Sequence, residues 1–194
     1  MKRLDRREVV RELLIDRGDL LVVAGLGATA WDVAAAGDCP LDFPLWGAMG
    51  AASMIGLGLA LAQPSRAVLV VTGDGEMLMG LSSLATIGVQ RPANYSLVVL
   101  DNEQYAETGG QPTHTALGTD LPAAARACGF SNPRLVERME DVAELRTAIH
   151  RRHGPLFASV KIAPDGAVRV LPPRDGAWLK HRMRAALLGA AAFD

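Results

Sequence analysis

The sequence predicts an α/β fold, a single doubly wound domain whose mainly parallel sheet is covered by helices on both faces. Short apolar runs alternate with helix-length segments along the chain, and no internal repeat or low-complexity tract interrupts them. Strands that are apolar on both faces are typical of a parallel sheet buried between two helical layers. A length of 194 residues with 49% hydrophobic residues suits one domain over 1–194.

Four apolar runs are the expected strands. The runs LLVVA, AVLVVT, SLVVLD and LFASVKI have the length of buried strands, and glycine, proline or polar residues lie close to them. The expected strands lie at 20–24, 67–72, 96–101 and 156–162.

The segments between these runs are expected to be helical. The first carries a stripe of Val9, Val10, Leu13 and Leu14 between charged residues, which is typical of a helix that packs by one face. Residues 1–18 would form an N-terminal helix, and 164–194 a C-terminal tail and helix. The expected helices lie at 3–17, 48–62, 76–89, 120–128, 141–152 and 177–192.

The segment 43–63 contains no charged residue and would pass a simple filter for a membrane span. Pro44 and Pro64 bracket it, many of its residues are glycine or alanine, and strands flank it. These features favour a fully buried helix that packs closely through its small residues.

Charge and composition also bear on partners and location. The formal net charge is −1, so no broad basic surface favours nucleic acid or anionic lipid. The charged start MKRLDRREVVRELL lacks the apolar core of a signal peptide, and two cysteines give no metal-ligand spacing. We therefore expect a cytoplasmic protein with no membrane segment.

The turn after the first strand matches a dinucleotide-binding fingerprint. Gly25 to Ala30 reads G-x-G-x-x-A, and Asp42 follows at a distance that suits a ribose contact. The fingerprint needs a helix that opens at its second glycine, but the segment 31–44 soon breaks at Gly37. We expect a short loop and helix without a nucleotide, with a nicotinamide-dependent reductase as an alternative.

The turn after the second strand has the residues of an anion and cation site. Gly73-Asp74-Gly75 lies between this strand and a helix, at the edge where parallel α/β sheets bind ligands. The glycines allow close backbone approach, the helix start offers free N–H groups, and Asp74 offers a hard oxygen ligand. The motif suits a diphosphate bridged to Mg²⁺, although GDG alone is also a common turn.

The residue pair Asp101-Asn102, at the end of the third strand, favours a metal and diphosphate site over an ordinary turn. Asn102 follows Asp74 by one helix and one strand, so both side chains should emerge at the same edge of the sheet. A carboxylate and an amide oxygen there can complete an octahedral Mg²⁺ site with phosphate oxygens.

This arrangement resembles the motif of thiamin-diphosphate (ThDP)-dependent enzymes, and the resemblance covers about 20–162. Within that family, the strings FPLWGAMGAASMIGLGLALAQP, GDGEMLMGLSSLATIG and LDNEQYAETGGQPTHT resemble the small subunit of sulfopyruvate decarboxylases and the matching region of phosphonopyruvate decarboxylases. The resemblance implies the ThDP-binding fold, with ThDP and Mg²⁺ as cofactors.

The resemblance also implies roles for the residues of the two turns. Asp74, the Asn102 side chain and the Gln104 backbone carbonyl would hold Mg²⁺. Gly75 and Glu76, next to Gly73 in the turn, would bind the diphosphate through backbone N–H groups.

Two further roles concern the aminopyrimidine end of the cofactor. The Gly47 carbonyl would accept a hydrogen bond from its 4′-amino group, and Met49 would be the apolar wedge that bends ThDP.

Two residues depart from the family pattern. Asp101 replaces the first asparagine of the usual Asn-Asn pair, and Glu76 replaces the common serine or alanine. A carboxylate beside a diphosphate is unfavourable unless it points away, so the Glu76 side chain is not an expected ligand.

The loop 103–119 should lie over the reacting carbon. Its polar members include Glu107 and His114, the two candidate catalytic residues. Related decarboxylases have a carboxylate near the position of Glu107, whereas His114 fits an exposed loop histidine equally well.

The resemblance implies the small, diphosphate-binding subunit of a non-oxidative, aldehyde-forming 2-oxo acid decarboxylase. The glutamate that activates the aminopyrimidine would come from a separate pyrimidine-binding subunit, so the chain would be active only in a hetero-oligomer. The substrate would be a small anionic 2-oxo acid. A carboligase subunit and a non-catalytic partner subunit are further alternatives.

Overall fold

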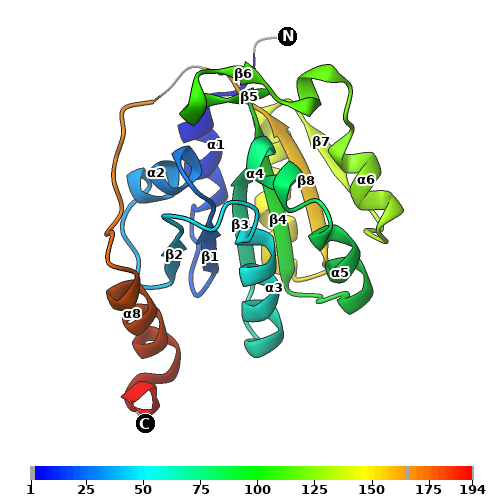
Figure 1. The fold of residues 1–194 in the computed structure, drawn as a ribbon. Coiled ribbons are helices and arrows are strands. Elements are labelled where there is room, and N and C mark those ends of the chain that lie inside the picture. The colour runs from blue at the N-terminus through cyan, green and yellow to red at the C-terminus, as the bar shows by residue number, and fades with distance from the viewer. Residues whose placement is uncertain (1–2, 165–166, 194) are drawn as a thin grey trace.

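The four predicted apolar runs form the centre of a six-stranded sheet in the computed structural model, which describes residues 3–164 and 167–193 (Figure 1). Every pairing in this sheet is parallel, in the order β2-β1-β3-β4-β8-β7. The predicted α/β fold is therefore confirmed. The strands are β1 (Leu21–Ala24), β2 (Asp42–Pro44), β3 (Val68–Gly73), β4 (Tyr95–Asp101), β7 (Arg134–Val136) and β8 (Leu156–Lys161).

Helices cover both faces of the sheet because alternate side chains of each strand point to opposite sides. In β3, Leu69 and Val71 join one buried cluster, whereas Val68 and Val70 join the other. The first face is covered by α1 (Arg6–Leu13), α2 (Ala28–Ala35) and α7 (Met139–Arg151), and the second by α3 (Ala52–Ala62), α5 (Ser83–Gln90) and α6 (Leu121–Ala127).

The remaining elements lie at the edges of the sheet. The hairpin of β5 (Gln104–Tyr105) and β6 (Gln111–Pro112) lies above the carboxyl ends of the strands in Figure 1, and α8 (Gly176–Leu188) packs beside β2. Trp46 donates a hydrogen bond from Nε1 to the Pro173 oxygen at 2.7 Å, so the C-terminal segment also contacts the loop before α3. The predicted tail 164–194 includes 165–166 and 194, which lie outside the described residues.

The single helix predicted at 76–89 is wrong, because the structure has two helices there: α4 (Asp74–Met79) and α5. The chain turns at Gly80, where a Cβ would lie 2.2 Å from the Gly50 oxygen. The loop before α3 therefore packs directly against the backbone of this turn. The edge strands β2 and β7, of three residues each, are additional to the predicted strands.

The prediction of a fully buried helix at 48–62 is wrong in two respects. Helix α3 begins only at Ala52, and one side of it is open, with Met54 40% and Leu61 51% exposed. Its other side packs closely, since Tyr95 donates a hydrogen bond from its hydroxyl to the Ser53 oxygen at 3.0 Å. Within the described ranges, no helix combines the length and apolar character that crossing a bilayer requires.

Two glycines of α3, Gly56 and Gly58, differ in how closely their surroundings pack, so substitution of each by alanine tests the packing of this helix. A Cβ at Gly56 would lie 2.1 Å from Val70 Cγ2, whereas a Cβ at Gly58 would meet no atom within 4 Å. Gly56→Ala should lower the free energy of unfolding by about 1–3 kcal/mol through overpacking. Gly58→Ala should raise it by about 0.5–1 kcal/mol, because alanine favours the helix. Urea denaturation of both variants measures this difference, and equal effects would contradict the packing described.

Candidate functional site

A cavity of about 350 Å³ opens at the carboxyl edge of the sheet, between the turns that follow β1, β3 and β4. The sequence places predicted site residues on several of these turns, and the parallel strands bring them together. The cavity is lined by all the predicted site residues except Gly47 and His114: Met49, Gly73, Asp74, Gly75, Glu76, Asn102, Gln104 and Glu107.

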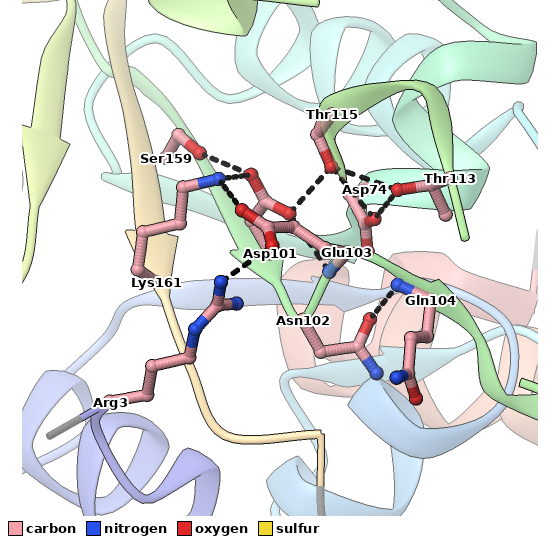
Figure 2. Close-up of polar contacts among 10 residues, drawn as sticks. All are labelled: Arg3, Asp74, Asp101, Asn102, Glu103, Gln104, Thr113, Thr115, Ser159 and Lys161. Atoms are coloured by element: carbon pink, nitrogen blue, oxygen red, sulfur yellow. Dashed lines mark hydrogen bonds and ion pairs between the residues drawn. The ribbon is translucent and has the colours of Figure 1, made fainter. Parts of the chain in front are cut away.

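Asp74 is the first residue of α4 and is 2% exposed. Its Oδ2 accepts hydrogen bonds from the hydroxyls of Thr113 at 2.5 Å and Thr115 at 3.3 Å (Figure 2). Burial raises the pKa of the Asp74 carboxyl above its usual range, although the Thr113 hydrogen bond opposes this rise. Because both threonines bond to Oδ2, the other carboxylate oxygen has no side-chain partner among the described residues and can bind a cation.

Asn102 follows β4 and is 7% exposed. Its Oδ1 accepts a hydrogen bond from the Gln104 backbone N–H at 3.1 Å, and the intervening Glu103 has a left-handed φ of 63°. This local turn fixes the amide oxygen, which has a second lone pair for a ligand. The turn also explains how Asn102 and Gln104 come to line the same cavity.

These oxygens fit a hard divalent cation. The predicted ligands are one carboxylate, one side-chain amide and one backbone carbonyl, and all belong to residues that line the cavity. In the part of the chain that the structure describes, no group of three or more His, Cys, Asp or Glu residues is placed to hold a metal. A Mg²⁺ ion at this cavity would therefore take further oxygens from a phosphate ligand or from water.

Asp101, the first departure from the family pattern, is paired with a lysine that the sequence analysis missed. Lys161 lies directly opposite Asp101 in the parallel register of β4 and β8, and its Nζ lies 2.7 Å from Asp101 Oδ2. The Asp101 side chain is 2% exposed, so this pair offsets much of the cost of burying its charge. A single charged residue, the lysine at the end of this strand, was the available signal.

The lysine belongs to a larger charge network over the same edge (Figure 2). Its Nζ also lies 2.8 Å from Glu103 Oε1, and Arg3 Nη2 lies 2.5 Å from Glu103 Oε2. Partial burial acts to lower the pKa of Lys161, but its hydrogen bonds with Asp101 and Glu103 raise it overall. The bonds from Lys161 and Arg3 hold the pKa of Glu103 below its usual range.

Two buried threonines, also missed, join the loop over the site to the sheet. Thr113 is fully buried and Thr115 is 8% exposed. Besides its contact with Asp74, the Thr115 hydroxyl lies 2.8 Å from Asp101 Oδ1. The loop is therefore anchored to both buried carboxylates, but threonines in a polar loop have no distinctive sequence pattern.

The two candidate catalytic residues lie in different surroundings. Glu107, in a 3-10 turn (Ala106–Thr108), is exposed, and its Oε1 lies 3.1 Å from the position of a Cβ added to Gly27. It therefore lies beside the start of α2, at the rim of the cavity. His114 is exposed in the turn His114–Leu117 and is not among the residues that line the cavity.

The Gly25–Ala30 turn leads into a short helix, as the sequence predicts. Helix α2 opens just after Gly27, whose φ is 80°, and ends at Ala35, before Gly37. Leu26, Ala28 and Thr29 line the same cavity as Asp74, so this turn belongs to the site.

Asp42 does not support the nucleotide alternative, because it is the first residue of β2 and pairs with Arg17 at 2.5 Å. It therefore lies where the strands of the sheet begin, whereas the cavity lies at their carboxyl ends.

Comparisons with known proteins find a matching family model and similar proteins. The family model described as "Thiamine pyrophosphate enzyme, C-terminal TPP binding domain" matches residues 28–160. The chain is 40% identical to the sulfopyruvate decarboxylase subunit beta of Methanothermobacter thermautotrophicus, over 84% of this chain and 85% of that protein. It is 38% identical to the phosphonopyruvate decarboxylase of Streptomyces viridochromogenes, over 86% of this chain but only 42% of that protein.

The fold is also found in a solved structure. Benzoylformate decarboxylase from Polynucleobacter necessarius aligns with a TM-score of 0.68 at 20% identity, covering 84% of this chain and 34% of that chain. At this identity the likeness concerns the fold alone.

The pairing of Asp101 with Lys161 gives a stability prediction. Lys161→Met leaves a buried carboxylate without its cation, so it should lower the free energy of unfolding by about 2 kcal/mol. This value lies below that of a fully buried pair because the Lys161 side chain is 20% exposed. Adding Asp101→Asn should restore at least about 1 kcal/mol, since the uncompensated charge is then absent.

Denaturant unfolding of the single and double variants measures this coupling. Arg138→Met, which removes an exposed pair with Asp141, is the control and should cause no measurable change. Strictly additive effects of Lys161→Met and Asp101→Asn would contradict the pairing.

Proposed function

Because this chain belongs to the family of thiamine pyrophosphate enzyme C-terminal TPP-binding domains, we propose that it is the diphosphate-binding subunit of a ThDP-dependent 2-oxo acid decarboxylase. The observation that carries the proposal is the cavity shared by Asp74, Asn102 and Gln104 at the carboxyl edge of the sheet. Their oxygens would hold Mg²⁺, and the turns after β1 and β3 would offer backbone N–H groups to the diphosphate.

This placement gives the cofactor and the chain different roles in the reaction. ThDP, when bound, supplies the thiazolium carbon that adds to a 2-oxo group and accepts the electron pair left as CO₂ departs. The chain itself would bind and orient the cofactor. Met49, 40% exposed at the cavity wall, would be the apolar support beneath it, and Gly47 would accept a hydrogen bond from the aminopyrimidine.

The proposal includes a partner chain. The glutamate that activates the aminopyrimidine would lie on a separate pyrimidine-binding subunit, and a non-oxidative, aldehyde-forming reaction would need both chains. The match to a protein named as a subunit beta, over 85% of its length, supports this arrangement. So does the exposed apolar surface that Met49 and Met79 form at the cavity, where they are 40% and 62% exposed.

The proposed substrate is a small anionic 2-oxo acid. The relatives are named for sulfopyruvate and phosphonopyruvate, each of which carries a second anionic group. In this chain the buried guanidinium of Arg6 lines the cavity and places a cation there, although Asp32 pairs with it at 2.6 Å. The partner would supply the other contacts to the substrate. Glu107 and His114 remain candidates for catalysis in the assembled enzyme.

The metal ligand gives the direct test of the site. Asp74→Ala should abolish Mg²⁺-dependent ThDP binding by the assembled complex, because it removes the proposed carboxylate ligand. Cofactor content after desalting, measured by mass spectrometry, reports the result. Asp38→Ala, at an exposed aspartate that pairs with Arg182, is the control and should retain the cofactor. Unchanged ThDP content in Asp74→Ala would overturn the site assignment.

The apolar surface gives a separate test of the partner. Met79→Glu places a charge on an exposed apolar residue, so it should weaken association with the second subunit by at least about tenfold without lowering the thermal stability of this chain. Leu135→Glu, at an exposed residue of the edge strand β7, is the matched control. Sedimentation or pull-down with the partner measures the effect, and equal binding by both variants would place the interface elsewhere.

A further inference from the structure

Glu76, the second departure from the family pattern, has its carboxylate almost entirely inside the protein. The residue is 4% exposed, and burial raises the pKa of its carboxyl group above the usual range. Its Oε2 accepts hydrogen bonds from the Leu26 backbone N–H at 3.0 Å and from the Thr72 hydroxyl at 2.8 Å. Its Oε1 accepts one from the Gly50 backbone N–H at 3.3 Å.

These partners come from three different segments around the cavity. Leu26 belongs to the turn between β1 and α2, Thr72 to the end of β3, and Gly50 to the loop before α3 that also carries Met49. Glu76 itself is in the first turn of α4. One side chain therefore connects the diphosphate side of the cavity to the side where Met49 lies.

The surroundings are shaped to this carboxylate. A Cβ at Gly25 would lie 1.9 Å from Glu76 Oε2 and 3.0 Å from Thr72 Oγ1, so only glycine leaves room for the side chain there. All three partners are hydrogen-bond donors, which a carboxylate can satisfy and a serine or alanine at position 76 could not. Gly25, which has no side chain, thus leaves the space that the Glu76 carboxylate occupies.

We propose that Glu76 is a positioning residue that holds the β1–α2 turn and the loop carrying Met49 in their cofactor-binding arrangement before the cofactor binds. This inference rests on the proposed ThDP site for its functional half. Its structural half, that one carboxylate fixes both loops, concerns the chain alone and can be tested without cofactor.

Amide hydrogen exchange tests the structural half. In Glu76→Ala, exchange at Leu26 and Gly50 should be at least about tenfold faster, because both amides lose their acceptor. In Glu76→Gln, the amide oxygen can replace Oε2 but its NH₂ group would face the Gly50 N–H. Protection should therefore return at Leu26 and not at Gly50. Wild-type exchange rates at both residues in Glu76→Ala would overturn the proposal.

The match with Gly25 gives a second, independent measure. Gly25→Ala should strongly reduce the thermal stability of the wild-type chain and should have a smaller effect in the Glu76→Ala background, because the clash with the Glu76 carboxylate is then absent and only the approach to Thr72 remains. Additive effects of the two substitutions would contradict the contact on which the proposal depends.

Cofactor affinity in the assembled complex tests the functional half. Glu76→Ala should weaken ThDP binding at fixed Mg²⁺ by about tenfold or more, and Glu76→Gln should weaken it less. The control is Asn94→Ala, because the buried Asn94 amide also bonds to three groups, the carbonyls of Ala60, Gln63 and Arg66, but before β4 at the amino edge of the sheet. It should lower stability and leave ThDP affinity within about twofold.

The outcomes separate this inference from the proposed function. If Glu76→Ala frees both loops yet binds ThDP as tightly as the wild type, Glu76 is only structural and the inference fails while the proposed function stands. If the wild-type complex does not bind ThDP, the proposed function fails, the functional half of the inference fails with it, and the exchange data alone decide whether the carboxylate holds the loops.

Discussion

Three carboxylates buried at one edge of a parallel sheet constrain the rest of this structure. Asp74, Glu76 and Asp101 are each at most 4% exposed, and a buried carboxylate without partners is strongly unfavourable. Two loop threonines bond to Asp74, backbone N–H groups and the Thr72 hydroxyl bond to Glu76, and a lysine of the neighbouring strand bonds to Asp101 together with one of the same threonines. Satisfying the carboxylates therefore also determines where the loops around the cavity lie.

This arrangement separates the part of the site that would bind the cofactor from the part that shapes the cavity. Asp74 lines the cavity together with Asn102 and Gln104, and its Oδ1 has no side-chain partner among the described residues, so the proposed metal would bind there. Asp101 and Glu76 direct their oxygens at protein donors instead. The two residues that depart from the family pattern thus bond to the loops, and the residues that match the pattern would contribute the ligands.

The sequence predicted the central strands, the α/β class and eight of the residues that line the cavity, because apolar runs and the ends of parallel strands are recorded locally in the chain. It did not reveal the edge strands β2 and β7, whose three residues carry no clear pattern. It also did not reveal the break at Gly80, which depends on the approach of the Gly50 backbone. The partners Lys161, Thr113 and Thr115 were missed for the same reason, since their roles arise from contacts between residues far apart in sequence.

Native mass spectrometry of the protein, gently purified from its own host, tests the central claim most directly. The account predicts a complex that holds a second chain of comparable size together with the masses of ThDP and Mg²⁺. A lone chain or a homo-oligomer without ThDP, under conditions that preserve known complexes, would contradict it.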